Sequence, residues 1–294
     1  MHWPHPRCVS ASHKPDPHAN EELPKTSSQP SEEPKEQIEL FHDVLLALEE
    51  SRVPYAVSGA FALRHHTGIC RFTKDLDLFV TAANCEAALR CLGRAGMETW
   101  VKDPVWLAKA SRDGFFVDLI TGMSNGLITV EDSWIERGCP AVVYGVKTRV
   151  LAPEELVASK IFVARRERFD GADIAHIIYS THGSFDWTRE MELVGEHWEM
   201  LLWALVLFRY AYPAQSHHVP DKIWRELLRR FEREIREPNP QAPFRGSLVD
   251  DNMFAIDVNE WEMANLMEEQ RKVRLSQLDE LEAENGKKAM RKEA

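Results

Sequence analysis

The sequence predicts an α/β (α+β) fold, in which a mixed, twisted sheet flanked by helices is followed by an all-helical C-terminal domain. β-prone runs alternate with helical patterns from about residue 36, strand signals fade beyond Asp170, and the rest of the chain has helical spacing. A length of 294 residues fits one large or two modest domains. We expect a disordered tail over 1–35, the α/β domain over 36–180, and the helical domain with its charged tail over 181–294.

The α/β half begins with an amphipathic helix, because Val44 and Leu48 recur with other apolar residues at helical spacing. Short β-prone runs bounded by small residues predict the strands that follow. Pro153 opens a further helix, and Glu154 and Glu155 lie at its positive end. In chain order we expect a helix over 36–51, a strand over 55–57, a helix over 60–66, a strand over 76–80, a helix over 82–95, paired strands over 100–111 and 115–120 with a turn at 112–114, and a strand over 142–150.

The second half is expected to be helical. The most apolar run, 200–212, is interrupted by Arg209 and is too short to span a membrane, so it predicts a buried helix. From Glu268 onward Glu, Lys and Arg dominate, which predicts a solvated helix that frays into a tail. The expected helices cover 174–179, 187–210, 222–235 and 261–287.

Composition limits the classes of protein that the chain can belong to. The net charge of −11 argues against extended DNA binding, which needs a basic surface. The five cysteines are scattered without a Cys-x-x-Cys pair, and no secretory signal opens the sequence. We therefore expect reduced thiols in a cytoplasmic protein with no membrane segment.

Asp75 and Asp77 are the first candidates for chemistry. They begin an apolar strand, and residues two apart on a strand point to the same face. Two carboxylates this close repel each other unless a cation lies between them, and Mg²⁺ prefers carboxylate and phosphate oxygens. An Asp-x-Asp pair alone is also common in turns and at solvated strand ends, so its interpretation depends on its surroundings.

Asp118 supplies a third carboxylate. It lies within the apolar run 114–120, where a lone acid is costly unless it is paired, for example with Arg71, or bound to a metal. Three carboxylates on two strands suit two Mg²⁺ ions, or Mn²⁺ in their place; one activates a hydroxyl and the other steadies a triphosphate and its departing pyrophosphate. We predict that Asp75, Asp77 and Asp118 are the catalytic residues and the metal ligands.

Ser58 and Gly59 lie between a strand and a helix, where an anion is readily bound. Gly59 lets a phosphate approach the backbone, and free N–H groups at the helix start point toward it. Arg71 and Lys74 add positive charge suited to phosphate oxygens. Ser-Gly after a strand is usually only a turn, but its position ahead of the three acids favours a nucleotide site.

These motifs resemble those of a known group. Ser58-Gly59 followed by Arg71-x-Thr73-x-Asp75-x-Asp77 is similar to the signature of the polymerase-beta-type nucleotidyltransferase superfamily, especially its minimal bacterial members and its abortive-infection toxin type. Those families usually carry Gly-Gly or Gly-Ser at the turn. The resemblance covers about residues 55–178 and implies a nucleotidyltransferase core, an NTP substrate and magnesium.

A second segment extends the resemblance. Lys160 at the end of a helix, followed by Arg165, Arg168, Asp170 and Asp173, resembles the toxin-type pattern of a lysine and a later Arg/Asp-x-x-Asp segment. By this resemblance Lys160 contacts the phosphate or base of the nucleotide, and the other four residues orient the acceptor or the lysine. The structural alternative is a solvated helix face with i to i+4 charge pairs.

The sequence therefore predicts transfer of a nucleoside monophosphate from an NTP to an acceptor hydroxyl or phosphate, with release of pyrophosphate. Three acceptors fit: a small molecule such as an aminoglycoside-like compound, a protein side chain, or a tRNA end. One alternative is a non-catalytic nucleotide-binding or toxin–antitoxin-type regulatory module, and the toxin resemblance implies an antitoxin-like partner. Another is a helical interaction protein built around 187–290, which leaves the three acids unexplained.

Overall fold

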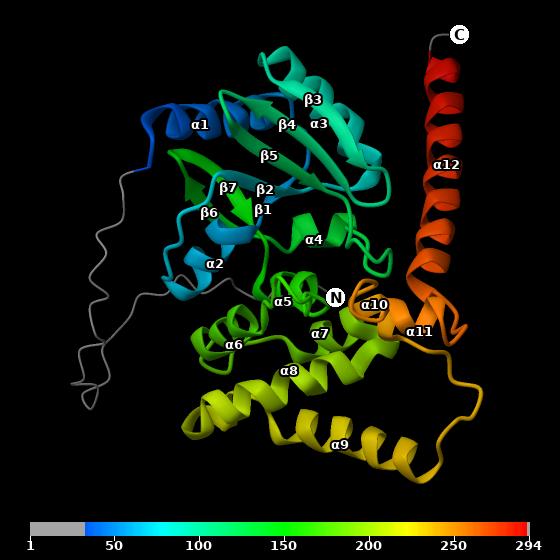
Figure 1. Ribbon diagram of the computed structural model, residues 1–294. Coiled ribbons are helices and arrows are strands. Elements are labelled where there is room, and N and C mark those ends of the chain that lie inside the picture. Colours follow the sequence, from blue (N-terminus) through cyan, green and yellow to red (C-terminus); the bar gives the residue numbers. More distant parts are fainter. Residues whose placement is uncertain (1–32, 293–294) are drawn as a thin grey trace, which may run out of the picture.

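A mixed sheet forms the centre of the first half of the chain (Figure 1). The computed structural model describes residues 33–292, so nearly all of the tail expected over 1–35 lies outside the described residues. Seven described strands form the sheet in the order β3-β4-β5-β2-β1-β7-β6. Two neighbouring pairs, β2 with β5 and β1 with β7, are parallel, and the others are antiparallel. The expected mixed sheet is confirmed; its strands are β1 (Ala56–Val57), β2 (Asp75–Phe79), β3 (Glu98–Asp103), β4 (Leu107–Arg112), β5 (Phe115–Ile120), β6 (Cys139–Val143) and β7 (Val146–Val150).

Helices flank the sheet, as expected. α1 (Lys35–Glu50) and α3 (Ala82–Arg94) pack against each other and against the strands, because each buries one apolar side in the core. α2 (Gly59–Thr67) contacts β2 and β7 and also packs against α5 (Pro153–Lys160) and α6 (Gly171–Ser180). It therefore joins the sheet to the helical half, close to the predicted site.

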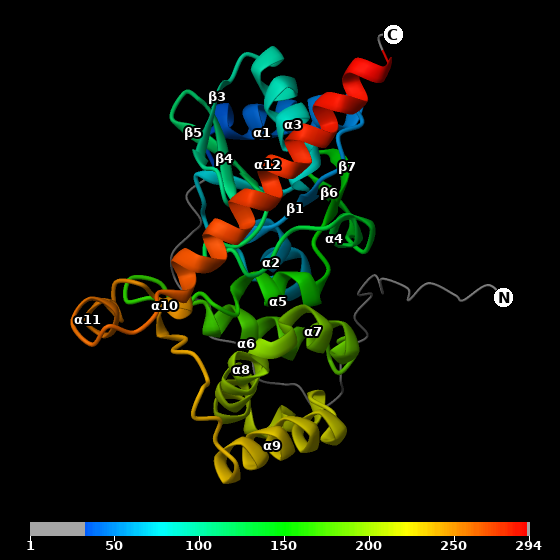
Figure 2. The ribbon, with the colours of Figure 1, turned by 90° about the vertical axis from the view of Figure 1, so that its right-hand side faces the viewer.

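The second half is helical, which confirms that part of the fold prediction. Figure 1 shows α5 to α9 stacked below the sheet, while α12 returns alongside it; in the view of Figure 2, α12 lies in front of the sheet. Arg271 of α12 donates to both carboxylate oxygens of Asp103 at 3.0 Å and to the Ser124 carbonyl at 2.7 Å. Within residues 33–292 no helix has the length and apolar character of a membrane span. The remaining helices are α4 (Asp132–Glu136), α7 (Trp187–Val194), η1 (Gly195–His197), α8 (Trp198–Ala211), η2 (Pro213–His218), α9 (Asp221–Arg236), α10 (Gly246–Val249), α11 (Ala255–Asn259) and α12 (Leu266–Lys292).

Two expected strands are wrong, because each contains a turn. The strand over 100–111 is divided into β3 and β4: the Asp103 carboxylate accepts from the Val105 backbone N–H at 3.0 Å and from Trp106 Nε1 at 3.1 Å, which folds the chain back. The strand over 142–150 is a hairpin of β6 and β7. Tyr144 and Gly145 have φ of 46° and 79°, the conformation of a tight hairpin turn.

Two expected helices also differ from the structure. The helix over 187–210 is interrupted at Gly195, whose φ of 51° lies outside the helical region and separates α7 from α8. The last helix begins at Leu266 rather than Trp261, and the short helices α10 and α11, which the sequence analysis did not anticipate, precede it.

Candidate active site

Three aspartates share one face of the sheet, which we call the acid face (Asp75, Asp77 and Asp118). In β2, Leu76 and Leu78 are buried, and the two acids alternate with them and point to the opposite side. β5 runs parallel to β2, and Asp118 is the register partner of Asp77. Register partners share a face, so the structure brings the three predicted acids together.

The acid face is electrostatically strained. The pKa of Asp77 is raised from 3.8 to about 6, first by burial and then by the negative charges of Asp118 and Asp75. The positive charges of Arg168 and Lys160 oppose this shift without cancelling it. The acid face therefore has a deficit of positive charge.

Lys109 holds the third acid. It lies directly opposite Asp118 on β4, and its ammonium donates to the two carboxylate oxygens at 2.8 and 2.9 Å. Burial raises the pKa of Asp118, and the charge of Lys109 opposes the rise. Sequence analysis offered Arg71 as an ion-pair partner for this acid; the partner in the structure is Lys109.

The turn between β1 and α2 lies against the acid face. The Ser58 backbone N–H donates to the Asp77 carbonyl at 2.8 Å, and the buried Ser58 side chain does not cap α2. Gly59 has φ +56°, and a Cβ there would lie 1.8 Å from Asp77 Oδ2. The glycine is therefore required by the approach of Asp77 itself, a constraint that the phosphate hypothesis did not include.

A second cluster of charges lies on the helical side of the site, and we call it the Lys160 network (Lys160, Asp170, Asp173, Arg168 and Arg71). The buried Lys160 ammonium lies 2.7 Å from Asp170 Oδ2 and 2.9 Å from Asp173 Oδ2. Arg168 donates to both oxygens of Asp170 at 2.9 Å, and Arg71 lies 2.6 Å from Asp173. Although burial opposes it, Arg168 and Lys160 hold the pKa of Asp170 below its usual value. The burial of Lys160 rules out the solvated-face alternative for this residue.

Two other predicted basic residues lie outside these clusters. Arg165 donates from its guanidinium to Ser124 Oγ at 2.6 Å, so it is bound to the loop after β5. Lys74 is exposed immediately before β2, and its carbonyl accepts from the Phe116 N–H at 3.3 Å. Lys74 is thus available to a ligand, whereas Arg165 is occupied by a protein group.

The donor chemistry of the acid face fits a divalent cation. Carboxylate oxygens are preferred ligands of Mg²⁺, and a cation would relieve the repulsion that raises the pKa of Asp77. Across residues 33–292, however, no group of three or more His, Cys, Asp or Glu side chains is already arranged to hold a metal. Lys109 donates to both oxygens of the third carboxylate.

Comparison with known proteins decides the family. Residues 37–199, more than half of the chain, match the model of a family described as "Nucleotidyl transferase of unknown function (DUF2204)". The chain belongs to this family. The expected membership of the nucleotidyltransferases is thereby confirmed, and the matched stretch contains every predicted site residue from Ser58 to Asp173. No curated protein matches the sequence.

Several solved structures are similar to this nucleotidyltransferase at low identity. The solution structure of the antibiotic-resistance factor ANT(2'')-Ia is 17% identical, with a TM-score of 0.39, over 62% of this chain and 96% of that one. An antigenic nucleotidyltransferase-like protein from Paracoccidioides brasiliensis is 20% identical, with a TM-score of 0.41, over 63% and 92%. The lincosamide antibiotic adenylyltransferase LnuA, in a lincomycin-bound crystal structure, is 14% identical, with a TM-score of 0.36, over 47% and 94%.

Lys109 is a residue of the candidate site that sequence analysis missed. The signal for it lies in the hairpin turn: Asp113 and Gly114 have φ of 56° and 82°, and Asp-Gly is a preferred two-residue hairpin turn. Counting outward from this turn pairs Lys109 with Asp118, as the structure does. Strand register, rather than local sequence pattern, identifies the counterion.

Proposed function

We propose that the chain transfers a nucleoside monophosphate from an NTP to an acceptor hydroxyl or phosphate in a magnesium-dependent reaction that releases pyrophosphate. The observation that carries the proposal is the acid face, where Asp77 and Asp118 are register partners and Asp75 lies two residues away on the same side. Membership of a nucleotidyltransferase family supports nucleotide transfer in general. The acid face supplies the chemistry that such a transfer needs.

The triphosphate would bind at the start of α2. N–H groups in the first turn of a helix have no partner within the helix, and the helix dipole makes this end positive. Ser58 and Gly59 bring this end against Asp77, so phosphates held here would lie beside the acids. Lys74, exposed just before β2, would supply one cation, and Lys160, held between Asp170 and Asp173, a fixed one.

In the transfer step, an acceptor hydroxyl attacks the α-phosphorus and forms the new P–O bond. The bond from the α-phosphorus to the bridging oxygen of the β-phosphate breaks, and pyrophosphate leaves with that electron pair. Asp118 would take the hydroxyl proton, because burial raises its pKa and Lys109 fixes its orientation. Magnesium held by Asp75, Asp77 and Asp118 would supply charge neutralisation for the phosphates.

A labelling experiment tests the proposal and identifies the acceptor. The protein is incubated with each labelled NTP, magnesium and a total cell extract, which is then separated into small molecules, proteins and RNA. We expect the wild type to label one fraction and the Asp75→Asn/Asp77→Asn double variant to label none. Equal labelling by the folded double variant would contradict the mechanism.

A second candidate function is nucleotide binding without transfer, as in a regulatory module with an antitoxin-like partner. One observation favours it: Lys109 already neutralises Asp118, and the described residues contain no preassembled metal-ligand group. This candidate predicts that NTP binds without labelling any fraction, whether or not magnesium is present. The same incubation, combined with a binding titration, therefore separates the two functions.

A further inference from the structure

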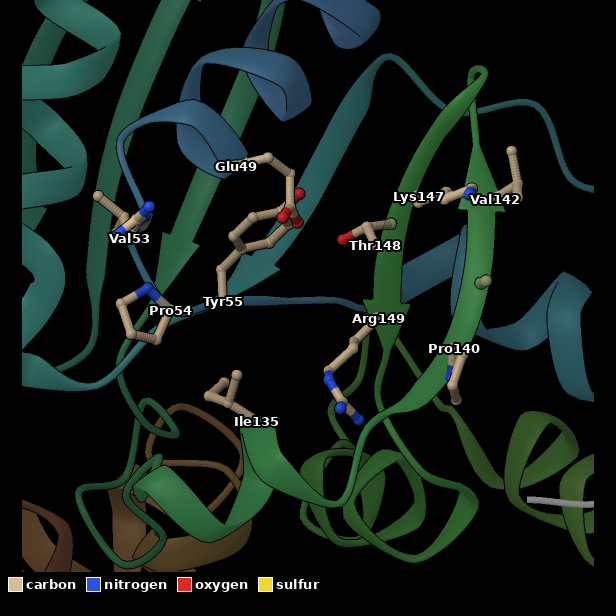
Figure 3. A pocket seen from close by; sticks show the side chains of 12 residues that line it. Glu49, Val53, Pro54, Tyr55, Ile135, Pro140, Val142, Lys147, Thr148 and Arg149 are labelled. Atoms are coloured by element: carbon tan, nitrogen blue, oxygen red, sulfur yellow. The ribbon is translucent and has the colours of Figure 1, made fainter. Parts of the chain in front are cut away.

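A cavity of about 840 Å³ opens at the edge of the sheet, between the end of α1 and the β6–β7 hairpin (Figure 3). Its size is in the range of pockets that hold metabolites. Hydroxyl and charged side chains line it together with an apolar wall formed by Val53, Pro54, Ile135, Pro140, Ala141 and Val142. The cavity thus has both polar and apolar parts.

The cavity is separate from the acid face. Val57 of β1 is the register partner of both Leu78 and Val150. Thr148, two residues before Val150, therefore shares the face of Leu78, which is opposite to that of Asp77. A ligand in this cavity would not meet the acids, so the cavity lies outside the proposed reaction.

Two buried hydroxyls in the cavity make no well-formed hydrogen bond. Tyr55 is 4% exposed and Thr148 is 8% exposed, and no partner within residues 33–292 meets hydrogen-bond geometry for either hydroxyl, although the phenol of Tyr55 lies near enough to Thr148 and to the Glu49 carboxylate for both to affect its pKa. Figure 3 shows the two side chains directed toward each other, with Glu49 beside Tyr55. A buried polar group without a well-formed hydrogen bond is destabilising, so this pair is suited to a hydroxylated ligand. Burial raises the pKa of Tyr55, which keeps its phenol protonated as a donor.

Cations border the cavity on both sides. Arg52 follows α1 and Lys147 lies on β7; both are exposed, and no ion pair holds either within the described part of the chain. Arg149 differs, because its guanidinium donates to the carbonyls of Gly138 at 2.7 Å and Glu136 at 3.2 Å. Arg52 and Lys147 are therefore free to attract an anion, and phosphate is bound well by both side chains.

Arg52 ends α1 in a left-handed cap. Its φ is 55°, and the next residue, Val53, donates its backbone N–H to the Leu48 carbonyl at 3.1 Å, as in a helix C-terminal cap. Glycine usually occupies this position. Arg52 lines the cavity, where glycine would provide no charge.

We propose that the cavity is a second ligand site, which takes a phosphorylated sugar, as in a nucleoside monophosphate, without a metal. Tyr55 and Thr148 bond the sugar hydroxyls, and Arg52 and Lys147 attract the phosphate. The apolar wall packs against a base. The two sources of this chemistry, a nucleotide and a free sugar phosphate, differ only in the base.

Calorimetric titration of the full chain in EDTA tests the proposal, with AMP, ribose 5-phosphate and inorganic phosphate as probes. We expect saturable binding of AMP, weaker binding of ribose 5-phosphate, and none of inorganic phosphate. The Tyr55→Phe/Thr148→Val double variant removes only the two hydroxyl groups and keeps the side-chain shapes close. It should weaken AMP binding about tenfold.

Two matched variants separate the possible outcomes. Lys147→Ala should weaken AMP binding, whereas Lys102→Ala, an exposed lysine on β3, should not.

Equal affinities for AMP and ribose 5-phosphate would assign the site to sugar phosphates. Absence of saturable binding by both probes, or the same affinity in a folded Tyr55→Phe/Thr148→Val variant, would overturn the proposal. The proposal would also be overturned if Asp75→Asn/Asp77→Asn lost AMP binding while Tyr55→Phe/Thr148→Val kept it, because AMP would then bind at the acid face.

Discussion

The acid face and the Lys160 network contain the same residue type in opposite electrostatic states. In the acid face, Lys109 pairs with Asp118 alone, and the pKa of Asp77 is raised to about 6. In the Lys160 network, three cations surround Asp170 and Asp173, and the pKa of Asp170 is lowered. The acid face has too few cations to balance its carboxylates, whereas the Lys160 network has three cations for two carboxylates.

This difference in charge balance indicates different roles for the acid face and the Lys160 network. Removing one partner of a buried ion pair destabilises the fold, because it leaves an uncompensated buried charge. A carboxylate cluster with too few cations destabilises the fold, and its charges favour cations from solution. We therefore propose metal and nucleotide chemistry for the acid face, and for the Lys160 network the positioning of Lys160 beside it. Changes made in each cluster test this contrast.

The largest expected effect is on nucleotide transfer. Asp77→Asn removes the central carboxylate of the acid face and should lower the transfer rate on the order of a thousandfold or more, measured with labelled NTP. Asp113→Asn makes the same substitution in an exposed turn and should leave the rate unchanged. A rate within a few-fold of the wild type in Asp77→Asn would remove the acid face from the mechanism.

In the Lys160 network the largest effect should be on stability. Lys160→Met leaves two buried carboxylates without their shared cation, and breaking a buried ion pair costs about 3–5 kcal/mol. Urea denaturation should show a clearly lower midpoint than for the wild type. Lys102→Met, on the exposed face of β3, serves as the control and should keep the wild-type midpoint. If the two variants unfold together, the network does not stabilise the fold.

The stability of the metal-free protein should depend on pH in a direction set by Asp77. Its pKa is 3.8 before folding and about 6 after, so the folded state binds the proton more tightly. The free energy of unfolding should therefore fall by on the order of 2–3 kcal/mol as pH rises from about 4 to about 6, relative to Asp77→Asn. Asp170 acts in the opposite direction, because its lowered pKa contributes stability that is lost as pH falls. Urea titrations of both proteins in EDTA check this; a pH-independent difference would contradict it.

The smallest effect concerns the internal cation. Lys109→Met should free both oxygens of Asp118 and increase the affinity for Mn²⁺ about tenfold, because the lysine competes for the same carboxylate. Electron paramagnetic resonance counts free Mn²⁺ and measures this directly. Unchanged affinity would show that Lys109 does not compete with the metal, and weaker affinity would show that it assists metal binding; both results contradict the prediction.

Local pattern in the sequence predicted much of the fold. The helices over α1, α3 and α9 followed from apolar spacing, and β2 and β5 from apolar runs. The hairpin turn at Tyr144-Gly145 was missed because it lies inside a continuous β-prone run, and the turn at Asp103 depends on side-chain bonds that no periodicity reveals.

Less of the candidate site than of the fold could be predicted from the sequence. The i, i+2 rule placed Asp75 and Asp77 on one side, but the partner of Asp118 depended on pairing β4 with β5. Lys160 was expected from resemblance alone, and its burial depends on how α5 packs on α6, which no local pattern encodes. Gly59 was given a role toward phosphate, whereas its contact with Asp77 required the tertiary structure.

The most direct test of the central claim is a titration of a non-hydrolysable NTP with and without magnesium, on the wild type and on Asp75→Asn/Asp77→Asn. If the acid face is the metal and nucleotide site, magnesium should strengthen binding to the wild type, and the double variant should lose this gain while it stays folded. The account would be contradicted if magnesium changed the NTP affinity of both proteins equally, or if the NTP affinity of the wild type did not depend on magnesium.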